Sequence, residues 1–227
     1  MIKFLSSRKI KEFFKKNIFL NFLISYPYRL IRSIYVFNYI KNYQGFNILT
    51  NEEKRIELLR IQNIYKCNYF VETGSFLGET TFFLKDYFEK CFTIEFDKNL
   101  YSKTYESLRN YKNIDCFNGD SRFLLKEICE KIDKKTLFWL DAHYSGGDTS
   151  YSINDCPLID ELKIIFSHEI KDHIILIDDA RCFLGMDDYP SIKTIQKLIL
   201  SHSNDYSMRI LNDIIMIYRF QWPKNNK

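Results

Sequence analysis

Short runs of apolar residues alternate with longer amphipathic stretches along the chain from about residue 52 onward. The short runs are rich in Val, Ile, Phe and Tyr, as buried strands are, and the longer stretches have the length and spacing of helices. The pattern predicts strands at 69–73, 91–96, 114–118, 136–141 and 173–178. It predicts helices at 52–64, 79–89, 98–110, 121–132, 157–168 and 190–202.

The C-terminal part of the pattern differs from the rest. The segments YSMRIL and IIMIYRF are β-rich and are joined by an Asn212-Asp213 turn, which predicts an antiparallel hairpin. The alternation of strands and helices before them predicts a parallel sheet covered by helices on both faces. The fold class is therefore α/β, with a seven-stranded, mostly parallel sheet that ends in an antiparallel hairpin.

The first fifty residues differ in composition and predict a separate segment. They hold nine Lys or Arg against one acid, Glu12, whereas the whole chain has a net charge of only +4. Large apolar residues interleave with these basic residues, which is typical of a basic amphipathic helix. We therefore divide the chain into a helical appendage at 1–50, rich in basic and aromatic residues, and a single domain at 51–227.

Three partners are compatible with this appendage. Its apolar face either packs on the following domain, which we slightly favour, or lies on anionic lipid through residues 1–45. Nucleic acid is the least favoured partner, because the basic residues accompany large aliphatic side chains. The apolar stretch at 18–28 is too short to span a bilayer, and no small-residue cleavage site follows it.

The six cysteines are widely spaced and include no C-x-x-C pair. This spacing is not that of a zinc site, and a disulfide framework is not expected in a chain of this length. We therefore expect a reduced, cytoplasmic protein, with an appendage that would suit work at the inner face of a membrane.

The segment YFVETGSFLGETTFFL, residues 69–84, puts a glycine turn between a predicted strand and a predicted helix. A dinucleotide-binding turn needs a glycine where Phe76 stands, and a phosphate-binding P-loop would end in Gly-Lys-Ser/Thr rather than Gly78-Glu79-Thr80. Glu72 would also repel a phosphate and suits a ligand that carries positive charge. The turn therefore predicts a ligand that is not held by its phosphates.

The E-x-G-x-x-x-G pattern of this turn resembles the first motif of class I S-adenosylmethionine-dependent methyltransferases, which have a Rossmann-like fold. Two later strand ends match the family: FTIEFD ends with Glu95, and NIDCFNGDS ends with Asp120 and Ser121. The resemblance implies that Glu95 accepts hydrogen bonds from both ribose hydroxyls and that Asp120 and Ser121 reach the adenine edge. It implies a set of residues that bind S-adenosylmethionine: Glu72, Thr73, Gly74, Ser75, Gly78, Glu95, Asp120, Ser121 and Asp141.

Each of the main residues also has an ordinary structural role open to it. Glu95 would then be an exposed acid at a strand end, Asp120 an N-cap, and Gly74 a turn glycine. All three follow the carboxyl ends of successive predicted parallel strands, where open α/β sheets bind their ligands. This coincidence favours the donor-binding interpretation.

A second group of acids follows the next two predicted strands. TLFWLDAHY ends a strand at Asp141, with His143 two residues on, and HIILIDDARCF ends a strand at Asp178-Asp179. This arrangement is similar to that of metal-dependent O-methyltransferases, such as the catechol and macrolide-sugar enzymes. The similarity implies Mg²⁺ bound by Asp141, Asp178 and Asp179, with Asp141 and His143 as catalytic residues and His143 as general base.

The acidic pair has a simpler interpretation too. Asp178 and Asp179 would only cap their loop, because carboxylates at strand ends are often solvated. Arg181, which follows the pair, would either contact an anionic substrate group or neutralise Asp179, and we favour the second role. Methyltransferases that act on amino groups of nucleic acids carry a Pro-Pro-aromatic motif after the fourth strand, and this chain has Asp141-Ala142-His143-Tyr144 there, which disfavours that subclass.

The sequence therefore predicts an S-adenosylmethionine-dependent methyltransferase that acts on the hydroxyl of a small molecule or glycan, with a role in glycan biosynthesis suggested by analogy. Two alternatives stay open. One is an NAD(P)-dependent oxidoreductase, which Phe76 and Asp120 disfavour. The other is a non-catalytic, membrane-associated module that binds an adenosyl ligand.

Overall fold

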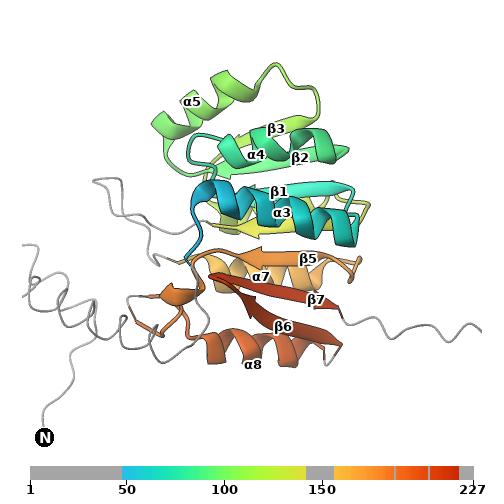
Figure 1. Cartoon of the computed structure of the whole chain (residues 1–227), viewed down its shortest axis with the longest axis vertical. Helices are drawn as coiled ribbons and strands as arrows, with labels where there is room; N and C mark the ends of the chain where they lie inside the picture. The colour runs from blue at the N-terminus through green and yellow to red at the C-terminus, as the bar shows by residue number, and fades with distance from the viewer. Residues whose placement is uncertain (1–47, 142–155, 187, 204, 220–227) are drawn as a thin grey trace, which may run out of the picture. The chain divides into compact units, whose positions relative to one another are not determined.

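The computed structural model describes residues 48–141, 156–186, 188–203 and 205–219 of the 227-residue chain (Figure 1). The chain separates into two units, 1–46 and 47–227, and every described residue belongs to the second. The predicted appendage at 1–50 lies almost wholly outside the described residues, so its structure and its boundary stay predictions.

A seven-stranded sheet with the order β3-β2-β1-β4-β5-β7-β6 forms the centre of the described unit. The first five strands in the chain pair in parallel, whereas β7 runs antiparallel to both β5 and β6. The predicted fold class, with its C-terminal hairpin, is confirmed. The strands are β1 (Tyr69–Thr73), β2 (Lys90–Glu95), β3 (Ile114–Asn118), β4 (Thr136–Leu140), β5 (Ile174–Ile177), β6 (Tyr206–Leu211) and β7 (Ile214–Arg219).

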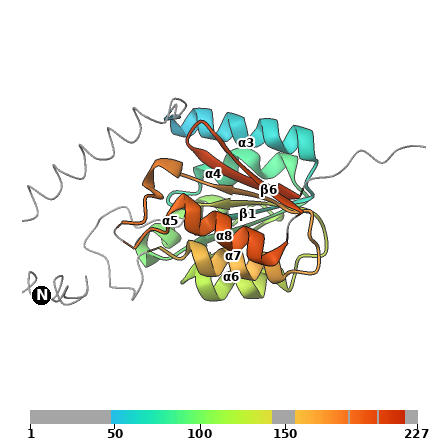
Figure 2. The same ribbon diagram turned by 90° about the horizontal axis from the view of Figure 1, so that it is seen from below.

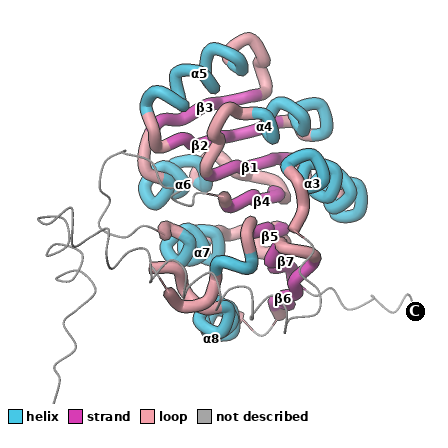
Figure 3. The backbone as a smooth tube through the Cα atoms, turned by 60° about the vertical axis from the view of Figure 1, so that its left-hand side comes forward, coloured by secondary structure: helices cyan, strands magenta, loops and turns pink. Residues whose placement is uncertain are grey.

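Helices cover both faces of this sheet, as predicted. Figures 2 and 3 show α3 and α4 on one face and α6 and α7 on the other. The helices are α3 (Asn51–Tyr65), α4 (Glu79–Leu84), α5 (Lys98–Leu108), α6 (Ser121–Cys129), α7 (Leu158–Ser167) and α8 (Ile192–His202), with 3-10 turns η1 (Lys85–Tyr87) and η2 (Ala180–Cys182).

The predicted helix at 79–89 is shorter in the structure, because α4 ends at Leu84 and continues only as the 3-10 turn η1. The Asn113 side chain donates to the carbonyl oxygens of Lys85, at 2.8 Å, and Phe88, at 3.3 Å. The first of these bonds satisfies the Lys85 carbonyl, which a helix extending to residue 89 would have paired internally. A side chain from the α5–β3 connection therefore ends the helix, and helical spacing alone does not reveal that.

The central strands explain the apolar runs in the sequence. Every residue of β4 and β5 is buried, since helices cover both faces of the sheet there. Phe70, Leu137 and Trp139 lie in one continuous core with residues of α3 and β7. This rigid centre carries the carboxyl ends of β1, β2, β4 and β5, where the predicted site residues stand.

Gly78 packs closely against α5, and replacing it tests whether this contact requires a glycine. Its φ angle is +75°, and a Cβ atom there would lie 2.8 Å from both Leu108 Cδ1 and Thr104 Cγ2 of α5. We expect Gly78→Ala to lower the free energy of unfolding by about 2–4 kcal/mol, because a left-handed conformation and an overpacked contact both add cost. Urea unfolding followed by circular dichroism measures the loss.

Gly185→Ala is the matched control, because Gly185 has nearly the same φ angle, +77°, but its added Cβ would meet Ser191 Cβ at 3.3 Å. We expect this variant to lose only the backbone contribution, about 1–2 kcal/mol. Equal losses in the two variants would show that the close approach of the turn to α5 is not what requires glycine at position 78.

Candidate active site

The glycine turn after β1 has an unusual backbone conformation and is hydrogen-bonded to the end of β2. Gly74, Phe76 and Gly78 all have positive φ angles, of 83°, 51° and 75°. The backbone N–H groups of Gly74 and Ser75 both donate to the carbonyl oxygen of Ile94, at 2.9 and 3.0 Å. The turn is thereby attached to the end of β2, so that the two predicted donor-binding motifs are one connected structure.

Glu95 lies at this junction, at the end of β2, and only 8% of it is exposed. Its Oε2 accepts from the Phe76 N–H at 2.8 Å and its Oε1 from the Asp97 N–H at 2.9 Å. Burial raises the pKa of Glu95, and these backbone bonds oppose that effect. An ionised carboxylate has about four acceptor positions. The Phe96 backbone also contributes a bond, so the carboxylate is held in one orientation and can still accept from a ligand through the positions that remain.

Glu72 points into the protein rather than out of the turn. It is 2% exposed, and its Oε2 accepts from the hydroxyls of Thr81, at 2.7 Å, and Thr93, at 2.8 Å. Burial is the main cause that raises its pKa to about 7, against the opposing effect of the threonine hydroxyls. In this geometry Glu72 joins β1, β2 and α4 beneath the turn, and its predicted contact with the donor stays a prediction.

Asp120 has the N-cap role that was the alternative to adenine binding. Its side chain accepts from the Arg122 N–H at 2.9 Å and also pairs with the Arg122 guanidinium. Burial opposes ionisation, but the Arg122 hydrogen bonds outweigh it and lower the pKa of Asp120. Ser121, next to it, is 6% exposed. Both residues begin α6 at the same edge as Glu95, so an adenine contact would add to the cap and not replace it.

Three exposed aromatic residues border this edge, and none of them was predicted from the sequence to contact a ligand. Phe76 is 61% exposed, Phe96 49% and Phe123 71%. Phe96 directly follows Glu95, and Phe123 lies in the first turn of α6, three residues after Asp120. Large apolar side chains that stay in water beside a polar site are candidates for stacking on a ligand ring. The available signal was their place in the sequence: Phe96 and Phe123 follow acids by one and three residues, and Phe76 lies in the glycine turn.

Glu161, in the first turn of α7, was also missed. It is only 1% exposed, and burial raises the pKa of its carboxyl to about 7, with Ser121 exerting an opposing effect. Its position on an amphipathic helix gave no sign that it turns toward the sheet. Glu161 is therefore a second buried carboxyl, in addition to Glu72, near the strand ends where S-adenosylmethionine is predicted to bind.

The second group of predicted acids, Asp141, Asp178 and Asp179, lies at the neighbouring ends of β4 and β5. The Asp141 N–H donates to Thr73 O at 3.0 Å, and the Asp178 N–H donates to Leu140 O at 3.1 Å. The end of β4 therefore lies between the glycine turn and the acidic pair. Burial, followed by the charges of Asp178 and Asp179, raises the pKa of Asp141 well above its usual range.

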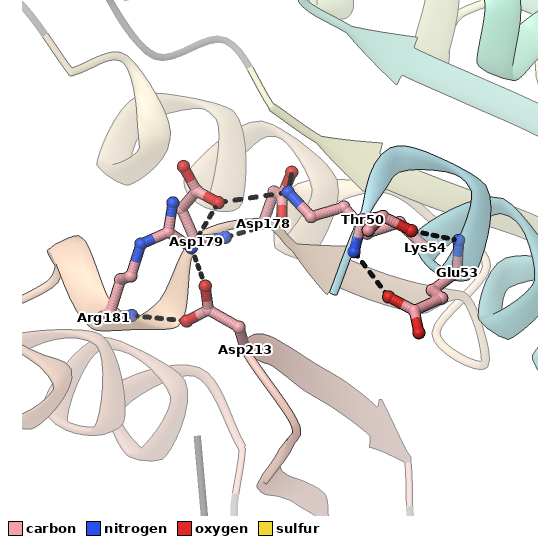
Figure 4. A network of polar contacts seen from close by, with 7 residues as sticks. All are labelled: Thr50, Glu53, Lys54, Asp178, Asp179, Arg181 and Asp213. Atoms are coloured by element: carbon pink, nitrogen blue, oxygen red, sulfur yellow. Dashed lines mark hydrogen bonds and ion pairs between the residues drawn. The ribbon is translucent and has the colours of Figure 1, made fainter. Parts of the chain in front are cut away.

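A lysine that the sequence analysis did not consider joins the acidic pair (Figure 4). The Lys54 ammonium of α3 donates to Asp178 Oδ2 at 2.6 Å and to Asp179 Oδ1 at 3.2 Å. Asp179 has a left-handed backbone with φ of +53°, and its N–H donates to Asp178 Oδ1 at 2.7 Å. The two aspartates therefore form a fixed unit with a cation from an element 124 residues earlier in the chain.

Arg181 lies on the other side of this unit and neutralises Asp179, as favoured from the sequence. Its guanidinium is 2.9 Å from Asp179 Oδ1 and also pairs with Asp213 in the β6–β7 turn (Figure 4). The Arg181 N–H donates to Asp213 Oδ1 at 2.9 Å. Asp213 is completely buried and was regarded only as a turn residue in the sequence analysis. The β6–β7 hairpin therefore holds Arg181 against Asp179 through Asp213. We call Asp178 and Asp179, at the end of β5, the acidic edge.

The predicted Mg²⁺ site does not fit this arrangement as it stands. Across the described ranges, no group of three or more His, Cys, Asp or Glu side chains is arranged to hold a metal ion. Lys54 already lies between two of the three predicted ligands. The metal and the catalytic role of Asp141 stay predictions, and His143 lies outside the described residues.

The predicted lipid contact of residues 1–45 also lies outside the described residues. None of the described helices has the length and apolar character needed to cross a bilayer.

Comparison with known proteins supports the methyltransferase fold. A methyltransferase from Podospora anserina with bound S-adenosylhomocysteine superposes with a TM-score of 0.55 at 13% identity, covering 76% of this chain and 80% of that one. An O-methyltransferase from Bacillus cereus, also with S-adenosylhomocysteine, has a TM-score of 0.55 at 11% identity, covering 83% and 90%. The chain has the fold of S-adenosylmethionine-dependent methyltransferases. The resemblance stated from the sequence motifs is therefore confirmed at the level of the fold.

A third structure, the O-methyltransferase TomG from Streptomyces achromogenes in complex with S-adenosylmethionine, has a TM-score of 0.54 at 10% identity and covers 77% of this chain and 82% of that one. No protein-family model matches the chain. A curated protein, ribosomal RNA small subunit methyltransferase A from Caldanaerobacter subterraneus subsp. tengcongensis, is 24% identical over 161 residues. The chain spans about 60% of the length of that relative.

Proposed function

We propose that this protein is a methyltransferase that uses S-adenosylmethionine to methylate the hydroxyl of a small molecule or glycan. The observation that carries the proposal is Glu95, a buried acid at the end of β2 whose carboxylate is oriented by the Phe76 and Asp97 N–H groups. It stands in a fold shared with structures that hold S-adenosylmethionine or S-adenosylhomocysteine.

The donor would lie across the carboxyl ends of β1, β2 and β4. Glu95 would accept from the two ribose hydroxyls with its remaining acceptor positions. The adenine ring would lie among Phe76, Phe96 and Phe123, the exposed aromatic residues of this edge, with its polar edge toward Ser121. The methionine end would lie over the glycine turn toward Asp141.

The methyl transfer itself needs a nucleophilic oxygen in line with the sulfonium methyl group. The oxygen–carbon bond forms as the carbon–sulfur bond breaks, the bonding electrons return to sulfur, and S-adenosylhomocysteine leaves as a neutral thioether. The hydroxyl proton must pass to a base. We assign that role to Asp141 or His143, and a carboxyl with a raised pKa, as Asp141 has, is a stronger base than one with an ordinary pKa.

The hydroxyl acceptor is favoured by the absence of a Pro-Pro-aromatic motif after β4 and by the names of two similar structures, which are O-methyltransferases. A radioactive methyl donor offered with alcohols, phenols, sugar nucleotides or total RNA tests the acceptor class. Label in RNA and in none of the hydroxyl compounds would overturn the hydroxyl acceptor while leaving the donor site intact.

Calorimetric titration with S-adenosylhomocysteine and, separately, with NAD tests the donor. We expect binding of S-adenosylhomocysteine and no binding of NAD, because Phe76 replaces the glycine that lets backbone approach a pyrophosphate. Binding of NAD alone would contradict the proposal and favour an oxidoreductase. Donor binding without methyl transfer to any acceptor would instead favour a non-catalytic module.

A further inference from the structure

The position of Lys54 is fixed by the start of α3. Thr50 caps this helix: its hydroxyl accepts from the Glu53 N–H at 3.3 Å, and the Glu53 carboxylate accepts from the Thr50 N–H at 2.7 Å. The Lys54 N–H then makes the first bond of the helix, to Thr50 O at 2.9 Å. A capping box of this kind fixes where a helix begins and so where the next side chain points. Figure 4 shows Lys54 extending from this first turn to the acidic pair.

The ion pair of Lys54 differs from the surface pairs of this chain. The side chain of Lys54 is 14% exposed and that of Asp178 3%, whereas both partners of the Lys163–Asp160 pair are about half exposed. Exposed pairs contribute little and are easily exchanged with water, but breaking a buried pair leaves an uncompensated charge. The lysine therefore has a stable place beside Asp178, and its ammonium is shared with Asp179.

We infer that Lys54 is the built-in cation of this acidic edge and occupies the position that a divalent metal ion would take between Asp178 and Asp179. Metal ions such as Mg²⁺ and Ca²⁺ lie about 2.0–2.6 Å from their carboxylate oxygens. The Lys54 nitrogen is at 2.6 and 3.2 Å from one oxygen of each aspartate, so the ammonium and a metal ion cannot use these oxygens together.

The charges of the surrounding groups explain why a cation is needed here. The Asp178 N–H donates to Leu140 O at 3.1 Å, which places the acidic pair beside the end of β4, and Asp213 lies behind the pair as a further acid bound to Arg181. Arg181 is committed to Asp179 and Asp213. Lys54 is the cation that reaches Asp178 among the described residues, and it is supplied by the chain itself.

The consequence is a competition that does not depend on the methyl donor. A divalent ion can bind the acidic edge only if Lys54 leaves it, so the wild-type protein should bind such ions weakly. Removing the ammonium while keeping the carboxylates should create a divalent-ion site. The inference would also make methyl transfer independent of added metal.

Calorimetric titration of the full-length protein with Mn²⁺ alone tests this directly. We compare the wild type with Lys54→Met, which removes the charge and keeps a long side chain, and with Lys54→Arg, which keeps the charge. We expect Lys54→Met to bind Mn²⁺ at least about tenfold more tightly than the wild type, because the buried Asp178 has lost its cation and the half-buried Asp179 keeps only Arg181. Lys54→Arg should resemble the wild type.

Two further variants make the result specific. Lys90→Met breaks the ion pair with Asp115 on β2 and β3, far from the acidic edge in the fold, and should leave Mn²⁺ binding unchanged. Adding Asp178→Asn to Lys54→Met should abolish the new binding. If Lys54→Met does not fold, as judged by circular dichroism, Lys54→Gln takes its place, since it retains a hydrogen-bond donor.

Equal Mn²⁺ affinity in the wild type and Lys54→Met would overturn the inference, because Lys54 would then not occupy the metal position. Absence of binding in both would overturn it as well, since the carboxylates would not form a cation site for Lys54 to fill. Neither result bears on donor binding, which the titration with S-adenosylhomocysteine measures separately.

Discussion

Replacing Glu95 with alanine is expected to weaken S-adenosylhomocysteine binding by about 2–4 kcal/mol, or roughly 30- to 1000-fold, in a domain that remains folded. The ligand would lose two hydrogen bonds to a charged acceptor, and the Phe76 N–H of the glycine turn would lose its partner as well. Glu95→Gln keeps one oxygen acceptor and should lose less. Calorimetric titration measures all three affinities.

Asp115→Asn is a suitable control for this experiment. Asp115 lies on the neighbouring strand β3 and pairs with Lys90. It is near the start of β3, whereas Glu95 lies opposite Asn118 at the end of that strand. Its replacement should leave the affinity unchanged. If Glu95→Ala is folded and binds the ligand as tightly as the wild type, Glu95 is an ordinary strand-end acid and the donor site must lie elsewhere.

The fold could be predicted from the sequence to within a few residues at most element ends, because its strands are short and buried. The strands predicted at 69–73 and 114–118 have those bounds in the structure. The central strands β4 and β5 are buried throughout and almost wholly apolar, so their apolar runs stand out in the sequence. Helix ends were less predictable, as with α4, because they depend on side chains such as Asn113 that come from other elements.

The candidate site was predictable only where its residues follow strands. Parallel strands bring their carboxyl ends to one edge, so Glu95, Asp120, Asp141 and Asp178 could be grouped without a structure. Their orientation could not. Residue spacing does not tell that Glu72 turns beneath the loop to Thr81 and Thr93.

Lys54 and Asp213 could not be predicted for a different reason. Each comes from an element far from the acidic pair in the chain, and the Asn212-Asp213 turn predicts a hairpin but not a contact with Arg181. Only the packing of α3 and of the β6–β7 turn against the end of β5 brings them to the carboxylates and Arg181. Long-range ion pairs of this kind leave no local pattern in a single sequence.

The two buried carboxyls predict an unusual response of stability to pH. Burial raises the pKa of Glu72 and of Glu161 from 4.5 to about 7 in the folded protein. Between pH 4.5 and 7 the folded state therefore binds protons that the unfolded state has released. Each carboxyl should contribute stability that is fully present below about pH 4.5 and is lost as the pH rises to about 7, by about 3 kcal/mol.

His173 acts in the opposite direction and must be separated from this effect. Burial lowers its pKa from 6.5 to about 3, so its contribution is lost as the pH falls below about 6.5. The stability of the wild type alone would mix these effects. The informative quantity is the difference in the free energy of unfolding between the wild type and Glu72→Gln or Glu161→Gln, measured by urea unfolding at several pH values.

We expect each glutamine variant to gain stability relative to the wild type as the pH rises from 4.5 to 8, by about 3 kcal/mol, because an amide has no proton to lose. The double variant should gain about twice as much if the two sites act independently. Glu106→Gln is the control, since Glu106 is an exposed acid that pairs with Arg109 on the surface of α5, and its difference from the wild type should show no comparable gain. A difference for Glu72→Gln that shows no gain either would mean that this carboxyl is ionised in the folded protein throughout the range. The hydroxyls of Thr81 in α4 and Thr93 in β2 would then stabilise the charge of Glu72 fully against the cost of its burial.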